Sequence, residues 1–105
     1  MGDRISIQFK NKNNISVALF SHWGGEAFKK DAKLYVKKLK QKILLSEELK
    51  GMPLGRLEPE TVMVDFIRDI TKDNLSVEND LYLGKDENDG DNSDNGNVII
   101  DLEKS

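Results

Sequence analysis

The sequence predicts an α+β fold with the element order ββααββ, in which two helices pack on one face of a four-stranded, mostly antiparallel sheet. Three patterns of apolar spacing predict this fold. Apolar residues alternate near the N-terminus, recur at three- and four-residue steps in the middle of the chain, and form short runs near the C-terminus. The chain has 105 residues and no internal repeat, so we expect a single domain over residues 1–105.

The first two elements have the pattern of a β-hairpin. Residues 4–10, RISIQFK, alternate between apolar and polar side chains, which is typical of a half-buried strand. The apolar members are Ile5, Ile7 and Phe9. Residues 11–14 contain three asparagines and favour a turn. Residues 15–23, ISVALFSHW, predict the partner strand, and the side chains expected on its core face are Ile15, Val17, Leu19 and Trp23.

Two helices follow in the middle of the chain. An apolar stripe predicts a helix from Gly25 to about Leu49, with Gly51 as its C-terminal cap. That stripe consists of Phe28, Ala32, Tyr35, Val36, Leu39 and Ile43. A second helix is expected to begin near Glu58 and Pro59, because proline suits the first helical turn. Its expected buried residues are Val62, Phe66, Ile67 and Ile70.

Two further strands are predicted at residues 80–84 and 97–103, joined as a second hairpin. Residues 85–96 contain five acids and no apolar residue, so we expect a flexible acidic loop over 85–97. The sheet face away from the helices is expected to be open. Its apolar residues would be Ala18, Phe20, Tyr82 and Ile99. They indicate either a homodimer or ligand contact on this face, or only scattered surface side chains.

Charge is divided unequally along the chain. Residues 1–50 carry 11 basic and 5 acidic residues, and residues 51–105 carry 5 basic and 14 acidic residues. Much of the positive charge lies on the first helix, at residues 29–42. A nucleic-acid phosphate backbone is one candidate ligand for such a face. The residues that would bind it are Lys29, Lys30, Lys33, Lys37 and Lys40. The alternative is a solvated helix face, favoured because this helix has no arginine and the whole chain is acidic.

The acidic loop contains a partial calcium-binding pattern. Residues 91–96, DNSDNG, match the opening of a calcium loop, in which oxygen ligands alternate along the chain. An EF-hand is excluded, because the twelfth position is Leu102 rather than glutamate. A weak, non-helical calcium site is the remaining cation hypothesis. Its ligands would be Asp89, Asp91, Ser93 and Asn95. The alternative is a charged loop that discourages aggregation.

The stretch SHWGG, residues 21–25, contains the only histidine and the only tryptophan. His22 suits proton transfer near neutral pH, and a glycine pair before a helix lets an anion approach its N-terminus. The candidate ligand-binding residues are Phe20, His22, Gly24 and Gly25. The alternative is that Trp23 anchors the core and the glycines make a tight turn. No catalytic residues are predicted, because the chain has no cysteine, no second histidine and no carboxylate fixed beside His22.

Three short pieces resemble small uncharacterised phage and prokaryotic proteins. They are the opening MGDRISI, the strand end ALFSHWGG and the closing IIDLE. Those proteins begin MG[TS]R and carry [CS]HW[DG]G at the end of the second strand. In this chain, Asp3 stands where Thr or Ser is usual, and Gly24 stands where Asp is frequent. The family has no established activity, so the resemblance implies only positions to test: Arg4, His22, Trp23 and Gly25.

These patterns favour a small, soluble, cytoplasmic binding or interaction protein that is not an enzyme. We expect its partner to be a protein, with a homodimer through the open sheet face as one form. No apolar run approaches the roughly 18 residues that span a bilayer, and no membrane partner is expected. The alternatives are calcium binding through residues 86–96 and nucleic-acid binding through residues 29–42. No cofactor is expected apart from calcium.

Overall fold

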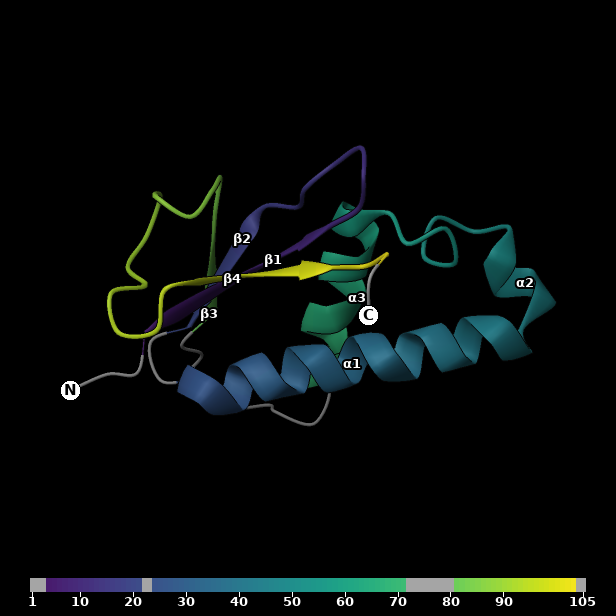
Figure 1. Ribbon diagram of the computed structural model, residues 1–105, viewed down its shortest axis with the longest axis horizontal. Coiled ribbons are helices and arrows are strands. Elements are labelled where there is room, and N and C mark those ends of the chain that lie inside the picture. The colour runs from purple at the N-terminus through teal and green to yellow at the C-terminus, as the bar shows by residue number, and fades with distance from the viewer. Residues whose placement is uncertain (1–3, 22–23, 72–80, 104–105) are drawn as a thin grey trace.

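The computed structural model describes residues 4–21, 24–71 and 81–103, whose arrangement is drawn in Figure 1. Within these residues, the strands are β1 (Ile5–Lys10), β2 (Ala18–Ser21), β3 (Leu81–Gly84) and β4 (Asn97–Asp101). The helices are α1 (Gly25–Leu45), the one-turn α2 (Glu47–Lys50) and α3 (Pro59–Thr71). The α+β fold is therefore confirmed, with a short α2 that the sequence did not predict.

The four strands form one sheet in the order β3-β2-β1-β4. β2 pairs antiparallel with both β1 and β3, so the first hairpin and the mostly antiparallel sheet are confirmed. β4 pairs with β1 in parallel, which makes the sheet mixed. The prediction that β3 and β4 form a second hairpin is wrong, because these strands point in the same direction and lie at opposite edges of the sheet. Parallel strands cannot be joined by a tight turn and need a connection that returns along the sheet.

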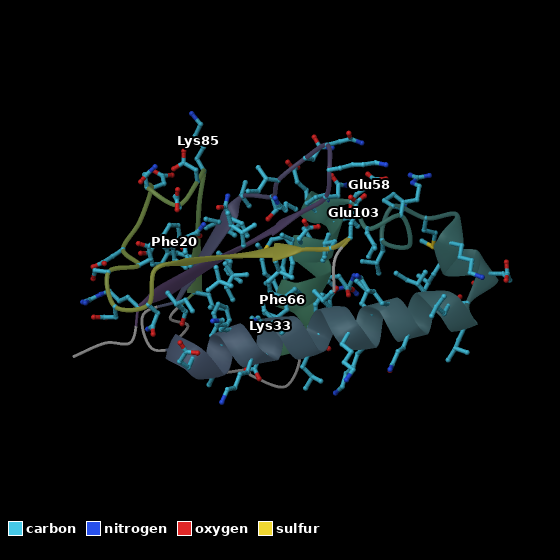
Figure 2. The ribbon with its side chains drawn as sticks, in the orientation of Figure 1. Phe20, Lys33, Glu58, Phe66, Lys85 and Glu103 are labelled. Atoms are coloured by element: carbon cyan, nitrogen blue, oxygen red, sulfur yellow. The ribbon has the colours of Figure 1, made fainter. Side chains whose placement is uncertain are left out.

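Helices α1 and α3 cover one face of the sheet and form the apolar core with it (Figure 1). The core contains the alternating residues of β1 and the predicted stripe of α1, with Ile43 only partly buried. Phe66 of α3 lies at the centre, with ring centroids 5.5 Å from Phe9 and 5.2 Å from Tyr35; it is labelled in Figure 2. Met63 is buried beside it although the sequence did not single it out.

Helix α1 ends at Leu45, earlier than the expected end near Leu49. Ser46 stops it by adopting an extended backbone with φ of −127°. The Ser46 hydroxyl then accepts a hydrogen bond from the Leu49 backbone N–H at 3.3 Å and becomes the N-cap of α2. Gly51 therefore caps α2 and not α1.

Strand β2 begins at Ala18, three residues after the start of the predicted run 15–23, whose last two residues lie outside the described residues. Ile15 and Val17 are exposed, so their predicted place on the core face is wrong. The cause is Ser16, whose hydroxyl accepts a hydrogen bond from the Phe9 backbone N–H at 2.9 Å. A side-chain oxygen thus takes a position in the ladder that a backbone carbonyl would otherwise fill.

Residues 85–96, here called the return loop, cover part of the second face of the sheet. Phe20 is 0% exposed on this face and stacks on Tyr82, with ring centroids 5.0 Å apart and planes inclined by 6°. A methyl group added at Gly90 would lie 2.7 Å from the Tyr82 ring and 2.9 Å from the Phe20 ring, so the loop backbone contacts both. Figure 2 labels Phe20 near this loop. The expectation of an open apolar face is therefore wrong for Phe20 and for the fully buried Ala18.

Beyond the aromatic pair, the second face carries Ile99, which is 48% exposed, and a row of hydrogen-bonded polar side chains. The Asn92 amide donates to the Ser6 hydroxyl at 2.8 Å, and that hydroxyl donates to Asn97 Oδ1 at 2.6 Å. Asn97 Nδ2 donates to Gln8 Oε1 at 2.9 Å. Gln8 Nε2 in turn donates to the Ser16 carbonyl at 3.0 Å. These bonds satisfy the buried polar side chains of β1 on the face away from α1 and α3.

Candidate functional site

A groove of about 660 Å³ lies between helix α1 and strand β4. One wall carries the three lysines Lys33, Lys37 and Lys40. The apolar lining comes from Val36, Leu44, Ile99 and Ile100, and the lining is completed by Gln41 and Asp101. In Figure 1, α1 and β4 run alongside one another in the same direction, and Lys33 is labelled on α1 in Figure 2.

Helical periodicity explains why these α1 residues share one wall. Lys33, Lys37 and Leu44 stand at steps of four and seven residues, with Lys40 between the last two, so all lie along one side of the helix. The core stripe lies next to this side, and Val36 belongs to both. The wall is therefore positively charged along its length and apolar at its base.

The opposite wall is the backbone edge of β4. Three consecutive residues, 99–101, line the groove, although neighbouring side chains of a strand point to opposite faces. They can do so together only because the groove runs along the strand edge. β4 is the last strand on its side of the sheet within the described residues, so this edge has no neighbouring strand there.

The hydrogen-bond pattern shows which backbone groups point outward. The Ser6 N–H donates to the Gly96 carbonyl, and the Leu102 N–H donates to the Lys10 carbonyl. In a parallel ladder this places the backbone groups of residues 96, 98, 100 and 102 toward β1. The N–H and C=O groups of Asn97 and Ile99 therefore face away from the sheet, and the Ile99 side chain is 48% exposed.

The other candidate lysines lie outside the groove. Lys30 is exposed and Lys29 is half-buried, and neither lines the groove. Lys38 and Lys42 face a smaller hollow of about 220 Å³ together with Asp65 and Asp69. Of the five lysines predicted for nucleic-acid contact, the structure thus brings three together.

The return loop is bonded to the start of β1 through Arg4. Arg4 Nε lies 3.2 Å from Asp91 Oδ2, and Arg4 Nη1 lies 3.7 Å from Asp94 Oδ2. The Arg4 backbone N–H also donates to Asp94 Oδ2 at 2.9 Å, and the Asn95 amide donates to the Arg4 carbonyl at 3.2 Å. Arg4, singled out by the resemblance, therefore anchors the loop.

The calcium candidates use several of their oxygens within the loop itself. Asp89 Oδ2 accepts the Lys85 backbone N–H at 2.8 Å, and Asp91 Oδ1 accepts the Ser93 backbone N–H at 3.0 Å. Among the residues that the structure describes, no three His, Asp or Glu side chains form a group able to hold a metal ion. The geometry therefore gives the calcium hypothesis no support.

The SHWGG corner is described only in part, because His22 and Trp23 lie outside the described residues. Gly25 has φ of 53°, and the Gly24 N–H donates to the Ser21 hydroxyl at 2.9 Å. A methyl group at Gly24 would lie 2.6 Å from Phe28 Cβ. The glycines therefore make the tight strand-to-helix turn. Phe20 is buried under the return loop and does not join them in one surface.

A polar contact joins the two long helices. The Tyr35 hydroxyl donates to Asp65 Oδ2 at 2.6 Å. Burial first, and then the hydrogen bond and charge of Asp65, raise the pKa of Tyr35 well above its ordinary value. The phenol therefore stays protonated at neutral pH and cannot act as a general base. The hydrogen bond between Tyr35 and Asp65 is a structural contact between α1 and α3.

Sequence reasoning identified the lysines of the groove but missed its β4 wall. The available signal was Leu44, an apolar residue outside the core stripe that is 73% exposed. It extends the side of the helix that carries Lys33 and Lys37. Nothing local to residues 97–101 indicates that they would lie beside that helix, since the pairing of β4 depends on the whole fold.

The described helices include none that is long and apolar enough to cross a membrane. Comparisons with known proteins add no relative: no family model, no curated protein and no solved structure matches this chain.

Proposed function

We propose that this chain is a non-catalytic binding module that holds an acidic partner protein in the groove between α1 and β4. One observation carries the proposal: three lysines stand along one wall of a groove whose base is apolar and whose other wall is a strand edge. A cytoplasmic location, expected from the cysteine-free sequence, forms part of the same proposal.

Charge favours an acidic partner. Lys33, Lys37 and Lys40 line the groove, and Asp101 at its end is the one carboxylate among the described lining residues. Asp101 lies 4.0 Å from Lys10, so part of its charge is balanced outside the groove. An excess of positive charge on one wall steers negatively charged partners and rejects positive ones.

The apolar base favours a protein over a nucleic acid. Val36, Leu44 and Ile99 offer contact area to aliphatic side chains. The lining residues that the structure describes include no aromatic ring on which a base could stack and no arginine to read a base edge. Asp101 would also repel a phosphate at the groove end.

The same charges disfavour a second copy of this chain as the occupant. Antiparallel pairing of two β4 edges would place both α1 helices on one face of the continued sheet. Lys33 and Lys37 of the two copies would then approach each other, and like charges in an interface oppose association. The homodimer expected at the open sheet face has no support there either, because Phe20 is covered.

The test is binding of a labelled seven-residue peptide with four glutamates separated by three valines, followed by fluorescence anisotropy at low salt. The double variant Lys33→Glu/Lys37→Glu should weaken binding by roughly thirtyfold, or about 2 kcal/mol. Each reversal replaces a favourable charge pair of up to about 1 kcal/mol by a repulsion.

The matched control is Lys12→Glu/Lys30→Glu, which changes the net charge equally at exposed positions outside the groove. It should lower affinity by no more than about threefold, through the long-range field alone. Equal losses for the two double variants would contradict the proposal. So would the absence of peptide binding, or stronger groove-dependent binding of a single-stranded oligonucleotide.

A further inference from the structure

We propose that the acidic partner binds as an added β-strand on β4, with acidic side chains at alternate positions facing α1. This inference rests on the proposed function and specifies the shape of the segment that is recognised. It makes the outer edge of β4 a docking edge for an extended polypeptide.

The first support is the backbone of β4. Asn97 and Ile99 are alternate residues of β4, and their backbone N–H and C=O groups point away from β1. No described residue bonds to these groups. An extended chain can satisfy both pairs of groups at once. A helix cannot, because its own backbone groups are bonded internally.

The second support is the match between lysine spacing and strand spacing. Lys33 and Lys37 are four residues apart on a helix, which is a rise of about 6 Å. Alternate side chains of a strand are about 6.7 Å apart. Acidic residues at every second position of an added strand would therefore meet successive lysines on the α1 side.

The third support is the other face of the same added strand. The side chains between the acidic ones would point to the second sheet face, beside Ile99, which is 48% exposed. Apolar side chains there would cover Ile99 and form a cross-strand pair with it. The recognised segment is thus an alternation of acidic and apolar residues.

The edge of β4 is also suited to a partner rather than to uncontrolled pairing. It is a short strand of five residues, flanked by lysines on α1. Charge beside an edge discourages neutral or basic strands and admits an acidic one.

The experiment uses the full chain and the same Glu-Val peptide, now methylated on one backbone nitrogen at a time. In an added strand, successive amides point alternately toward and away from β4. Methylation should therefore lower affinity about fivefold or more at every second position and leave the positions between them nearly unchanged. The unaffected positions serve as the internal control for any general effect of methylation on the peptide.

Whether the sensitive amides belong to the valines or to the glutamates also shows the direction of the added strand. Residues opposite Ile99 in an antiparallel pair share its face, so sensitivity at valine amides indicates antiparallel addition. Sensitivity at glutamate amides indicates parallel addition, because there the residues on the α1 face bond to β4. Either alternation supports the proposal.

Equal losses of affinity at all methylated positions, or no loss at any, would overturn the proposal that the peptide binds as an added strand. If binding still disappears in Lys33→Glu/Lys37→Glu, the groove remains the binding site and only the mode of binding is wrong. A peptide of the same composition with its glutamates and valines in two blocks should bind about tenfold more weakly, because its charges cannot follow the lysine row. Equal affinity of the block peptide would also overturn the alternation.

The variant Ile99→Pro adds a test on the protein side. Proline removes the outward N–H of residue 99 and leaves the ladder to β1 intact, which is the position where an edge strand tolerates proline. It should weaken peptide binding about fivefold while the circular dichroism spectrum is retained. Full affinity in a folded Ile99→Pro variant would overturn the proposal, and the methylated peptides decide the matter if that variant does not fold.

Discussion

The two faces of the sheet are covered in different ways. On one face, α1 and α3 pack apolar side chains against the alternating residues of β1. On the other, the return loop covers an aromatic pair at one end and a hydrogen-bonded row of Ser6, Gln8 and Asn97 elsewhere. The helix face therefore supplies most of the apolar burial, whereas the loop face depends on close backbone contact and on satisfied polar groups.

The largest expected effect comes from emptying the helix face. Phe66→Ala removes a fully buried ring in contact with the rings of Phe9, Phe28 and Tyr35, and should lower the free energy of unfolding by about 3–5 kcal/mol. Phe20→Ala on the loop face should cost less, about 2–3 kcal/mol, because a loop can settle into the space more readily than a helix. Chemical denaturation of both variants measures the difference. Equal losses would break the distinction between the two faces.

A smaller effect is expected from disturbing the loop contact itself. Gly90→Ala would press a methyl group against the rings of Tyr82 and Phe20 and should destabilise the protein by about 1–3 kcal/mol. The control is Gly51→Ala, where the nearest atom lies 3.9 Å away and the backbone is right-handed. That change should be neutral or slightly stabilising. If Gly90→Ala is also neutral in thermal unfolding, the return loop does not pack on the sheet as described.

The smallest effect concerns the polar contact at the rim of the helix face. Tyr35→Phe removes the hydrogen bond to Asp65 and should cost about 1 kcal/mol at neutral pH. The pKa of Tyr35 is raised by folding, so its contribution to stability is complete below the unfolded-state value of about 10 and is lost as pH rises above it. The unfolding free energy of the parent chain should therefore fall more steeply above pH 10 than that of Tyr35→Phe. Parallel curves for the two proteins would show that Asp65 and burial do not hold this proton.

Periodic patterns predicted the elements of the helix face well. The alternation of Ile5, Ile7 and Phe9 and the stripe of α1 are local properties, and the core uses both. The ends of the helices and strands were less predictable. Ser16 and Ser46 each redirect the backbone with one hydroxyl, and such competition is visible only when the neighbouring backbone group is known.

The candidate site was predictable only on its α1 side. Seven lysines between residues 29 and 42 indicate a charged helix face, but they do not reveal which of them will stand beside another element. That selection follows from the parallel placement of β4 next to β1, which joins residues far apart in the chain. A short strand pattern predicts a strand without naming its neighbour, and the assumed hairpin therefore placed β4 wrongly.

The pairing of β1 with β4 has a consequence for the order of folding. Ser6 and Asn97 bond to each other across a separation of 91 residues, and closing so long a chain costs about 4 kcal/mol in entropy. We expect the local hairpin and α1 to form earlier, and β4 to join late. The groove exists only once β4 has joined, so a partner that docks there would distinguish finished molecules from incompletely folded ones.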